Sequence, residues 1–202
     1  MREYFDRWSK RYESSFLWRW FFRPLHKRLL EWIQPLQEER ILDVGCGTGA
    51  LAYLLSNEGA ESWGADISPG MLELARERAG EAARHRFVEA SADALPFDME
   101  TFDRVISVIS FHHYPDPHES IKEMYRVLVP GGHILICDMC GEGVHSWLVL
   151  ALGRFLSIDE EYYSRAEMKG MLEDSGFVGI EIRLVRRFPR VMLAKGTKPD
   201  ER

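Results

Sequence analysis

The sequence predicts an α/β fold: a mostly parallel sheet that ends in an antiparallel C-terminal hairpin, with helices on both faces. Short apolar runs alternate with longer helical patterns along most of the chain, which is typical of βαβ units. Several of the short runs are apolar at consecutive positions, as expected of strands that are covered on both faces. The last two strand-like runs lie too close together for a parallel crossover, so they are expected to pair antiparallel.

The predicted elements follow one another in order along the chain. Strands are predicted at Arg40–Val44, Glu61–Asp66, His85–Glu89, Phe102–Val108 and Gly132–Met139. Helices are predicted at Thr48–Asn57, Pro69–Ala79 and Asp116–Leu128. Ser68 is the expected N-cap of the second helix, and Pro130-Gly131-Gly132 is a combination that ends the third.

The C-terminal part of the chain has a different pattern. A helix is predicted at Arg165–Asp174, followed by strands at Phe177–Leu184 and Phe188–Lys195. Only Val185-Arg186-Arg187 separates the two strands, so a hairpin with its turn at these residues is expected.

Composition limits the classes of function. A chain of 202 residues suits one domain with one core, so residues 1–202 are predicted as a single domain. The formal net charge of -6 argues against a nucleic-acid binder, because such a protein needs a basic face to neutralise phosphates. The three cysteines do not suggest a secreted disulfide framework, and no basic leader precedes an apolar run. A cytoplasmic protein is expected.

The segment Leu42–Gly49 (LDVGCGTG) follows a predicted strand and opens a helix. Its glycines allow a tight turn and a close approach to a ligand, and the helix N-terminus offers N–H groups to an anion such as a carboxylate. Gly45, Gly47 and Ala50 also fit a loose dinucleotide-binding pattern, which is weak evidence alone. Asp43 favours a cationic ligand over a pyrophosphate. S-adenosylmethionine, which carries an ammonium, a sulfonium and a carboxylate, therefore fits this loop better.

Asp66 ends the strand that follows the glycine loop. A carboxylate at this place, about twenty residues after such a loop, can accept both hydroxyl hydrogens of a ribose. The alternative is that Asp66 only caps a turn. Its spacing from the glycine loop favours the ribose-binding role.

Four motifs in this order resemble those of the class I S-adenosylmethionine-dependent methyltransferases. They are Leu42–Gly49, Ala65–Ser68, Ala94–Phe97 with Thr101–Asp103, and Arg126–Gly132. The sequence is most similar to the small branch that includes the ubiquinone and menaquinone biosynthesis C-methyltransferases, and the resemblance extends from about Tyr4 to Lys195. It implies a Rossmann-like sheet of seven strands, the last inserted antiparallel, and S-adenosylmethionine as cofactor.

The resemblance also implies a set of cofactor-binding residues. They are Tyr12, Asp43, Gly45, Gly47, Thr48, Asp66, Ile67, Ser91, Ala92 and Ser110. The loop residues would line the methionine end of the cofactor, Asp66 the ribose, and Ile67 the adenine. Many relatives have Asp or Asn where this chain has Ser91, so the contact to the adenine amino group would weaken here or pass to the backbone.

Two histidines follow the fourth predicted strand, in Ser110–Asp116 (SFHHYPD). Because ligands bind at the carboxyl ends of strands in open α/β sheets, His113 is the candidate general base. The alternative, that both histidines are structural, is favoured. Cys137 and Cys140 have C-x-x-C spacing, but no second such pair completes a zinc site, so no metal is expected.

Residues 1–34 are predicted as a helical N-terminal lid that is rich in aromatic residues. Its stretch Phe16–Arg23 interleaves aromatics with arginine, which also suits a water–lipid boundary. The lid interpretation is preferred, with Tyr12 near the cofactor, and peripheral membrane contact is the alternative. Trp147–Leu152 would add an apolar wall to the acceptor pocket.

Together these patterns predict an enzyme that transfers a methyl group from S-adenosylmethionine to a small acceptor, for which a hydrophobic character is one option. A regulatory or scaffold protein that binds the cofactor without catalysis is the alternative. A nicotinamide-dependent oxidoreductase is disfavoured by Asp43 and by the C-terminal hairpin. The acceptor and the methylated atom are left open.

Overall fold

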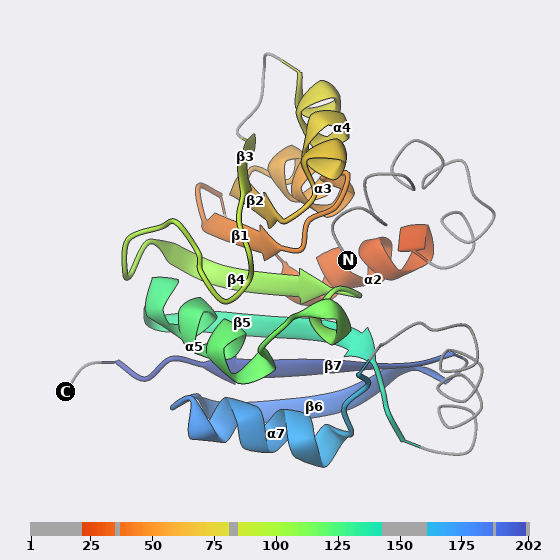
Figure 1. The fold of residues 1–202 in the computed structure, drawn as a ribbon, viewed down its shortest axis with the longest axis vertical. Helices are drawn as coiled ribbons and strands as arrows, with labels where there is room; N and C mark the ends of the chain where they lie inside the picture. Colours follow the sequence, from red (N-terminus) through yellow and green to blue (C-terminus); the bar gives the residue numbers. More distant parts are fainter. Residues whose placement is uncertain (1–21, 35–36, 81–84, 143–160, 188, 201–202) are drawn as a thin grey trace. The chain divides into compact units, whose positions relative to one another are not determined.

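The computed structural model describes residues 22–34, 37–80, 85–142, 161–187 and 189–200 (Figure 1). The chain divides into two compact units, Met1–Ser91 and Ala92–Arg202. Its seven strands have the order β3-β2-β1-β4-β5-β7-β6. The predicted fold class, a mostly parallel sheet with an antiparallel C-terminal hairpin, is therefore confirmed.

The first unit carries three parallel strands and three helices. In chain order they are α2 (Arg23–Ile33), β1 (Arg40–Val44), α3 (Ala50–Asn57), β2 (Glu61–Asp66), α4 (Pro69–Ala79) and β3 (His85–Glu89). β2 pairs in parallel with both β1 and β3. α3 contacts β2, and α4 contacts β3 (Figure 1). All three strands have the predicted bounds.

The helices of the first unit begin where local chemistry allows it. The Ser68 hydroxyl accepts a hydrogen bond from the Met71 N–H at 3.2 Å, so Ser68 is the N-cap of α4, as predicted. α3 begins at Ala50 rather than at Thr48. The reason is that Gly49 has a φ of 69°, a left-handed conformation that cannot be part of a right-handed helix.

Helix α2 lies in the segment that was predicted as a lid. Leu25, Leu29 and Ile33 recur at helical spacing and are all buried, as in an amphipathic helix with one apolar stripe. The helix contacts α3. Tyr12 and most of the aromatic stretch lie outside the described residues, as does Trp147–Leu152, so the lid and the apolar wall stay predictions. Within the described part of the chain, no helix has the length and apolar character needed to cross a bilayer.

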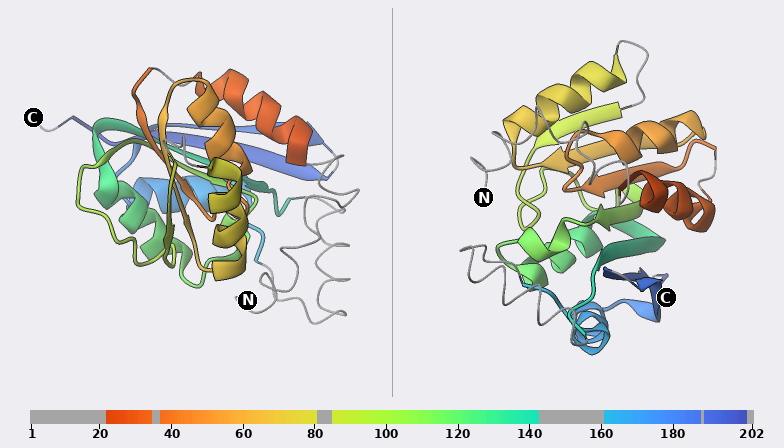
Figure 2. Two further views of the ribbon diagram at one scale, coloured as in Figure 1. Left: turned by 90° about the horizontal axis from the view of Figure 1, so that it is seen from above. Right: turned by 90° about the vertical axis from the view of Figure 1, so that its right-hand side faces the viewer.

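The second unit carries the other four strands. Its elements are β4 (Phe102–Val108), the short 3-10 helix η2 (Phe111–His113), α5 (Pro117–Val127), β5 (Leu128–Met139), α7 (Arg165–Asp174), β6 (Val178–Arg187) and β7 (Arg190–Thr197). β4 and β5 are parallel, whereas β7 is antiparallel to both β5 and β6. α5 and α7 contact each other and lie on the same face of these strands (Figure 2).

Strand β5 begins earlier than predicted, at Leu128, directly after α5. Phe102 pairs with Leu128, but Arg104 pairs with His133, so β5 carries extra residues at a bulge between these two pairs. Pro130 and Gly131 lie in that bulge, which accommodates a residue without an N–H and a residue with a φ of 75°. The predicted helix-breaking combination thus lies inside an irregular strand.

The predicted turn at Val185–Arg187 is wrong. These residues belong to β6, and Arg187 pairs with Arg190, so the chain reverses over a shorter connection. A register shift between Leu184 and Arg186 accommodates an additional residue in the strand. A bulge of this kind is set by pairing with β7, which the local sequence does not reveal.

Candidate functional site

The glycine loop follows β1 in a conformation that its glycines make accessible. Gly45, Gly47 and Gly49 all have left-handed φ values, of 70°, 52° and 69°. The N–H groups of Gly45 and Cys46 both donate to the Ala65 carbonyl, at 2.7 and 3.1 Å. The loop is therefore hydrogen-bonded to β2, whose last residue is Asp66.

Two of these glycines meet different surroundings. A Cβ at Gly49 would lie 2.8 Å from the Phe87 ring and 2.9 Å from the Ala75 side chain, so this glycine lets α3 begin close to neighbouring side chains. A Cβ at Gly47 would have no described atom within 4 Å. The backbone at Gly47 therefore borders open space, which a ligand can approach closely.

Asp66 is held by two backbone donors from different segments. Its Oδ2 accepts the Gly47 N–H at 2.8 Å, and its Oδ1 accepts the Ser68 N–H at 2.9 Å. One bond comes from the glycine loop and the other from the N-terminus of α4. The carboxylate is thus fixed between the loop and the helix, in the place predicted for the ribose-binding residue.

Asp43 is the buried acid of the site, only 3% exposed. Burial and, to a smaller extent, the negative charge of Asp66 raise the pKa of the Asp43 carboxyl to about 8. A cation bound near this loop would favour the ionised form of the Asp43 carboxyl. The electrostatics of the first unit therefore suit a positively charged ligand.

The other predicted residues of the first unit differ in exposure. Thr48 is buried, whereas Ile67 is 39% exposed, unusual for an isoleucine next to a buried strand end. Burial and the charges of Asp66 and Asp43 raise the pKa of the Cys46 thiol well above its usual range, so this thiol is a packing group rather than a nucleophile. Ser91 is the last residue of the first unit.

In the second unit, Ala92 is buried and Ser110 lies in the turn after β4. The residue before Ser110 is Ile109, with a φ of 51°. A β-branched residue in this region is a genuine outlier, and such strain persists only where the surroundings over-determine it. The Ile109 N–H donates to the Cys137 carbonyl at 2.8 Å, which fixes the turn against β5.

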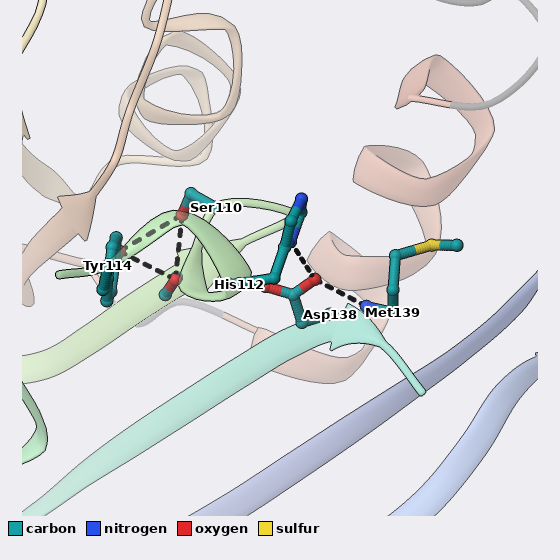
Figure 3. A network of polar contacts seen from close by, with 6 residues as sticks. Ser110, His112, Tyr114, Asp138 and Met139 are labelled. Atoms are coloured by element: carbon teal, nitrogen blue, oxygen red, sulfur yellow. Dashed lines mark hydrogen bonds and ion pairs between the residues drawn. The ribbon is translucent and has the colours of Figure 1, made fainter. Parts of the chain in front are cut away.

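The hydroxyl of Ser110 belongs to a cluster of three hydroxyl groups. Ser107 lies 2.9 Å from Ser110 and 2.9 Å from the Tyr114 hydroxyl, and Ser110 and Tyr114 are 3.2 Å apart (Figure 3). Ser107 is fully buried. Because each hydroxyl can donate once and accept twice, the cluster is internally satisfied and fixes Tyr114 relative to the turn.

His112 is bonded to Asp138, near the end of β5. The His112 Nδ1 lies 2.7 Å from Asp138 Oδ1 (Figure 3). The His112 backbone N–H donates to Asp138 Oδ2 at 3.1 Å, and the Met139 N–H donates to Oδ1 at 2.6 Å. Both side chains are more than nine-tenths buried. The carboxylate is therefore held by backbone donors on either side of its bond to the imidazole.

His113, the predicted general base, has a different environment. Burial, and then the neighbouring charge of His112, lower the pKa of His113 to about 3. Its imidazole is therefore neutral at physiological pH. The two rings are adjacent, with centroids 3.9 Å apart. A catalytic role for His113 stays a prediction.

Sequence reasoning missed Asp138, Ser107 and Tyr114. Asp138 lies between Cys137 and Cys140, a segment that was considered only for metal binding. An acid at the carboxyl end of β5, together with histidines in the turn after β4, was a usable signal. Cys137 and Cys140 are buried cysteines that form no disulfide. Burial raises the pKa of both. Among the described residues, no group of three or more His, Cys, Asp and Glu side chains is placed to hold a metal.

Comparisons with known proteins agree with this geometry. A family model described as "Methyltransferase domain" matches residues 42–136. The chain is 42% identical over 106 residues to a demethylmenaquinone methyltransferase of Clavibacter sepedonicus, covering 52% of this chain and 43% of that protein. It is 35% identical over 144 residues to a ubiquinone biosynthesis O-methyltransferase of Vibrio cholerae, covering 65% and 57%. The chain thus spans about half the length of the curated relatives it matches.

Solved structures show the same fold over nearly the whole chain. A complex between the Haloferax volcanii Trm112 methyltransferase activator and a methyltransferase gives a TM-score of 0.85 at 24% identity, covering 100% of this chain and 98% of that one. A methyltransferase from Thermotoga maritima gives 0.78 at 23% identity, covering 98% and 99%. S-adenosylmethionine is the methyl donor of this family. Motifs, strand order and sequence matches lead to one conclusion: residues 42–136 carry a methyltransferase domain, with the strand order of the class I S-adenosylmethionine-dependent methyltransferases.

Proposed function

We propose that this protein transfers the methyl group of S-adenosylmethionine to a small organic acceptor. The observation that carries the proposal is the position of Asp66, whose carboxylate accepts N–H groups from Gly47 and Ser68. This arrangement places a fixed acceptor beside a glycine loop with open space at Gly47. A nucleoside with vicinal hydroxyls fits such a site, because a carboxylate has several acceptor positions beyond these two bonds.

Asp43 supports a sulfonium nucleoside over a neutral or phosphorylated one. Its raised pKa of about 8 reflects burial without sufficient compensating positive charge. The ammonium and sulfonium of S-adenosylmethionine would supply that charge and favour the ionised carboxyl. A pyrophosphate would instead add negative charge beside two acids. The nicotinamide-dependent alternative is therefore disfavoured.

The remaining cofactor contacts are proposed from the family motifs. The loop backbone from Gly45 to Thr48 would bind the methionine end, and the exposed Ile67 would be covered by the adenine ring. Further proposed contacts are Tyr12, Ser91, Ala92 and Ser110. The Ile67 side chain is 39% exposed and is therefore accessible to such a ring.

Catalysis would rest mainly on positioning. The sulfonium already makes the methyl group electrophilic, so alignment of acceptor and donor contributes much of the rate, up to about 7–11 kcal/mol in the best cases. We propose His113 as an acceptor-facing residue. As a neutral imidazole, it would accept a hydrogen bond from the substrate rather than hold its proton.

The acceptor that we propose is an aromatic compound with a ring hydroxyl. Two sets of relatives are named for demethylmenaquinone and for ubiquinone biosynthesis, and quinol rings carry such hydroxyls. The three cysteines of the chain are buried and form no disulfide, which supports the proposed cytoplasmic location, because reducing compartments disfavour disulfides.

Isothermal titration calorimetry tests the cofactor assignment. Wild-type protein is titrated with S-adenosylmethionine, with S-adenosylhomocysteine and with NADH as the control ligand. We expect both sulfur nucleosides to bind, Asp66→Ala to lose binding, and the exposed control Asp98→Ala to retain it. Folded wild-type protein that binds neither sulfur nucleoside, or that binds NADH instead, would contradict the proposal.

Turnover is then measured with S-adenosylmethionine carrying a tritiated methyl group. Naphthohydroquinone and catechol represent aromatic hydroxyl acceptors, and ethanolamine represents an aliphatic amine. Label transfer to either aromatic compound would support the proposed acceptor class. Transfer to ethanolamine alone would reject it, while leaving the methyltransferase assignment intact.

A further inference from the structure

We propose that His112, oriented by Asp138, is the catalytic base that removes the proton from the acceptor hydroxyl. The inference rests on the proposed methyl transfer to an aromatic hydroxyl compound. It differs from the sequence analysis, in which His113 was the candidate base and a structural role for both histidines was favoured. The geometry that supports it is the buried imidazole–carboxylate pair of the second unit (Figure 3).

The carboxylate of Asp138 acts as a hydrogen-bond acceptor. Two backbone N–H groups, those of His112 and Met139, donate to it at 3.1 and 2.6 Å. Both oxygens of this carboxyl group therefore act as hydrogen-bond acceptors. The remaining 2.7 Å contact, to His112 Nδ1, is then a hydrogen bond from an Nδ1–H donor. We therefore assign the Nδ1–H tautomer to His112.

This tautomer makes Nε2 the proton-accepting nitrogen of the neutral ring. When Nε2 takes a proton, the adjacent carboxylate stabilises the imidazolium that forms, as in hydrolases with a histidine–aspartate pair. Because Asp138 is only 2% exposed, water weakens this interaction little. The pair thus has the two properties that a general base needs, a fixed tautomer and a stabilised cation.

The pair lies where this fold class binds ligands. His112 follows β4, and Asp138 is the penultimate residue of β5, so both lie at the carboxyl ends of adjacent parallel strands. The turn between Val108 and His112 contains the strained Ile109, at a φ of 51°. Strained backbone that its surroundings hold in place is concentrated at functional sites.

The two neighbouring histidines are not equivalent. The ring centroids of His112 and His113 lie 3.9 Å apart, so a charge on one disfavours a charge on the other. The charge of His112 is one cause of the lowered pKa of His113, which is about 3. Because Asp138 is bonded to His112, a proton arriving at this pair of rings is held by His112.

The proposed step transfers one proton to His112 and one methyl group to the acceptor. The acceptor O–H bond breaks, its proton moves to His112 Nε2, and the bonding electron pair stays on the acceptor oxygen. That oxygen attacks the methyl carbon of S-adenosylmethionine, and an O–CH₃ bond forms. The S–CH₃ bond breaks, and its electron pair stays on sulfur as the neutral thioether of S-adenosylhomocysteine. The imidazolium of His112 then loses its proton to solvent.

The alternative is a purely structural role, in which the His112–Asp138 hydrogen bond holds η2 against β5. His112→Asn separates the two roles, because the asparagine amide can still donate to Asp138 but cannot accept a substrate proton. We expect kcat for naphthohydroquinone or catechol to fall by about a hundred- to ten-thousand-fold. The acid limb of the wild-type pH–rate profile should disappear with it. Asp138→Asn should also lower kcat, whereas the exposed control His118→Asn should not.

The competing base is tested in the same assay. A larger loss for His113→Asn than for His112→Asn would overturn the proposal, as would a His112→Asn variant with wild-type kcat and an unchanged pH profile. Binding of S-adenosylmethionine, measured by calorimetry on every variant, reports the proposed function separately. A wild type that fails to bind the cofactor contradicts the proposed function, whatever the state of His112.

Long-range proton–nitrogen correlation spectra of the histidine rings decide the matter without an acceptor. We expect His112 to show the Nδ1–H tautomer, with an unprotonated Nε2. An Nε2–H tautomer would overturn the proposal. A wild type that binds the cofactor but methylates neither aromatic compound would overturn the aromatic hydroxyl acceptor, and with it this role of His112.

Discussion

Gly47 donates its backbone N–H to the Asp66 carboxylate across 2.8 Å, which joins the glycine loop to the residue that ends β2. The bond depends on a left-handed backbone at Gly47, with a φ of 52°. The loop conformation and the orientation of the proposed ribose-binding acid are therefore coupled. Different substitutions in the loop should therefore change cofactor affinity and folding stability to different extents.

Gly47→Ala and Gly49→Ala should differ in what they damage. Both place a Cβ on a left-handed residue, which costs about 1–2 kcal/mol. Only at Gly49 does the Cβ also meet Phe87 and Ala75, at 2.8 and 2.9 Å, and such overpacking adds about 1–3 kcal/mol. Urea unfolding should therefore show the larger loss of stability for Gly49→Ala.

Relative to its loss of stability, Gly47→Ala should weaken cofactor binding more than Gly49→Ala does. At Gly47 the new methyl group would occupy the open space that the cofactor approaches. We expect calorimetry to show weaker binding of S-adenosylmethionine by Gly47→Ala even where the protein is fully folded. Unchanged affinity in that variant would mean that the ligand does not approach Gly47.

Cofactor binding should release protons near neutral pH. Asp43 has a pKa of about 8 without ligand, so it is mostly protonated at pH 7. A bound cation favours its ionised form, and the proton leaves on binding. Calorimetry at pH 7, in two buffers of different ionisation enthalpy, should detect the release. Asp43→Asn, which has no proton to lose, should abolish this contribution, and equal release by the variant would exclude Asp43 as its source.

Asp43 should also lower stability at alkaline pH. Its pKa rises from an ordinary value of 3.8 to about 8 on folding, so the folded state binds the extra proton between these values. Stability therefore falls as pH rises through this window and reaches its full deficit above pH 8. Asp43→Asn should remove the deficit and be more stable than wild type by roughly a few kcal/mol above pH 8. The difference should vanish below pH 4.

Arg126 should contribute more to folding stability than an ordinary surface cation does. Its guanidinium donates to the carbonyls of Phe97 and Leu95, at 2.7 and 2.9 Å, and to Glu123 at 2.6 and 2.8 Å. Several charge-assisted hydrogen bonds from one partly buried guanidinium group are stronger than one exposed ion pair. Arg126→Ala should therefore cost about 1–3 kcal/mol of unfolding free energy.

Lys122 provides the matched control on the same helix. It forms an exposed pair with Glu119 at 3.0 Å, of a kind worth about 0–1 kcal/mol. Lys122→Ala should therefore leave the urea midpoint near that of wild type. Equal losses in the two variants would show that the carbonyl contacts of Arg126 contribute little.

The sequence predicted the elements that local pattern determines. β1 contains the apolar pair Ile41-Leu42 directly before the glycine loop, and α4 follows a serine N-cap and begins at a proline; both elements have the predicted bounds. The start of β5 and the end of β6 were missed because both depend on bulges. A bulge is a property of two paired strands, whereas a single strand's sequence shows only its own composition.

The candidate site divides in the same way. The glycine loop and Asp66 could be predicted because one motif contains the loop and a fixed spacing gives the acid. Which of His112 and His113 meets Asp138 could not, because the answer depends on a 3-10 turn after β4 and on the position of β5 beside it. The pKa of Asp43 was equally hidden, since burial is a tertiary property.

The position of β7 means that the sheet cannot be completed until this strand has been synthesised. β7 is the last strand in sequence, yet it pairs with β5 on one side and β6 on the other. During translation β6 emerges with no partner, and β5 presents an open edge, until Arg190–Thr197 has left the ribosome. Exposed strand edges are templates for aggregation. The interval before Arg190–Thr197 has been made is thus the one in which the nascent sheet most needs a chaperone, and termination before Arg190 would leave a product that cannot complete this sheet.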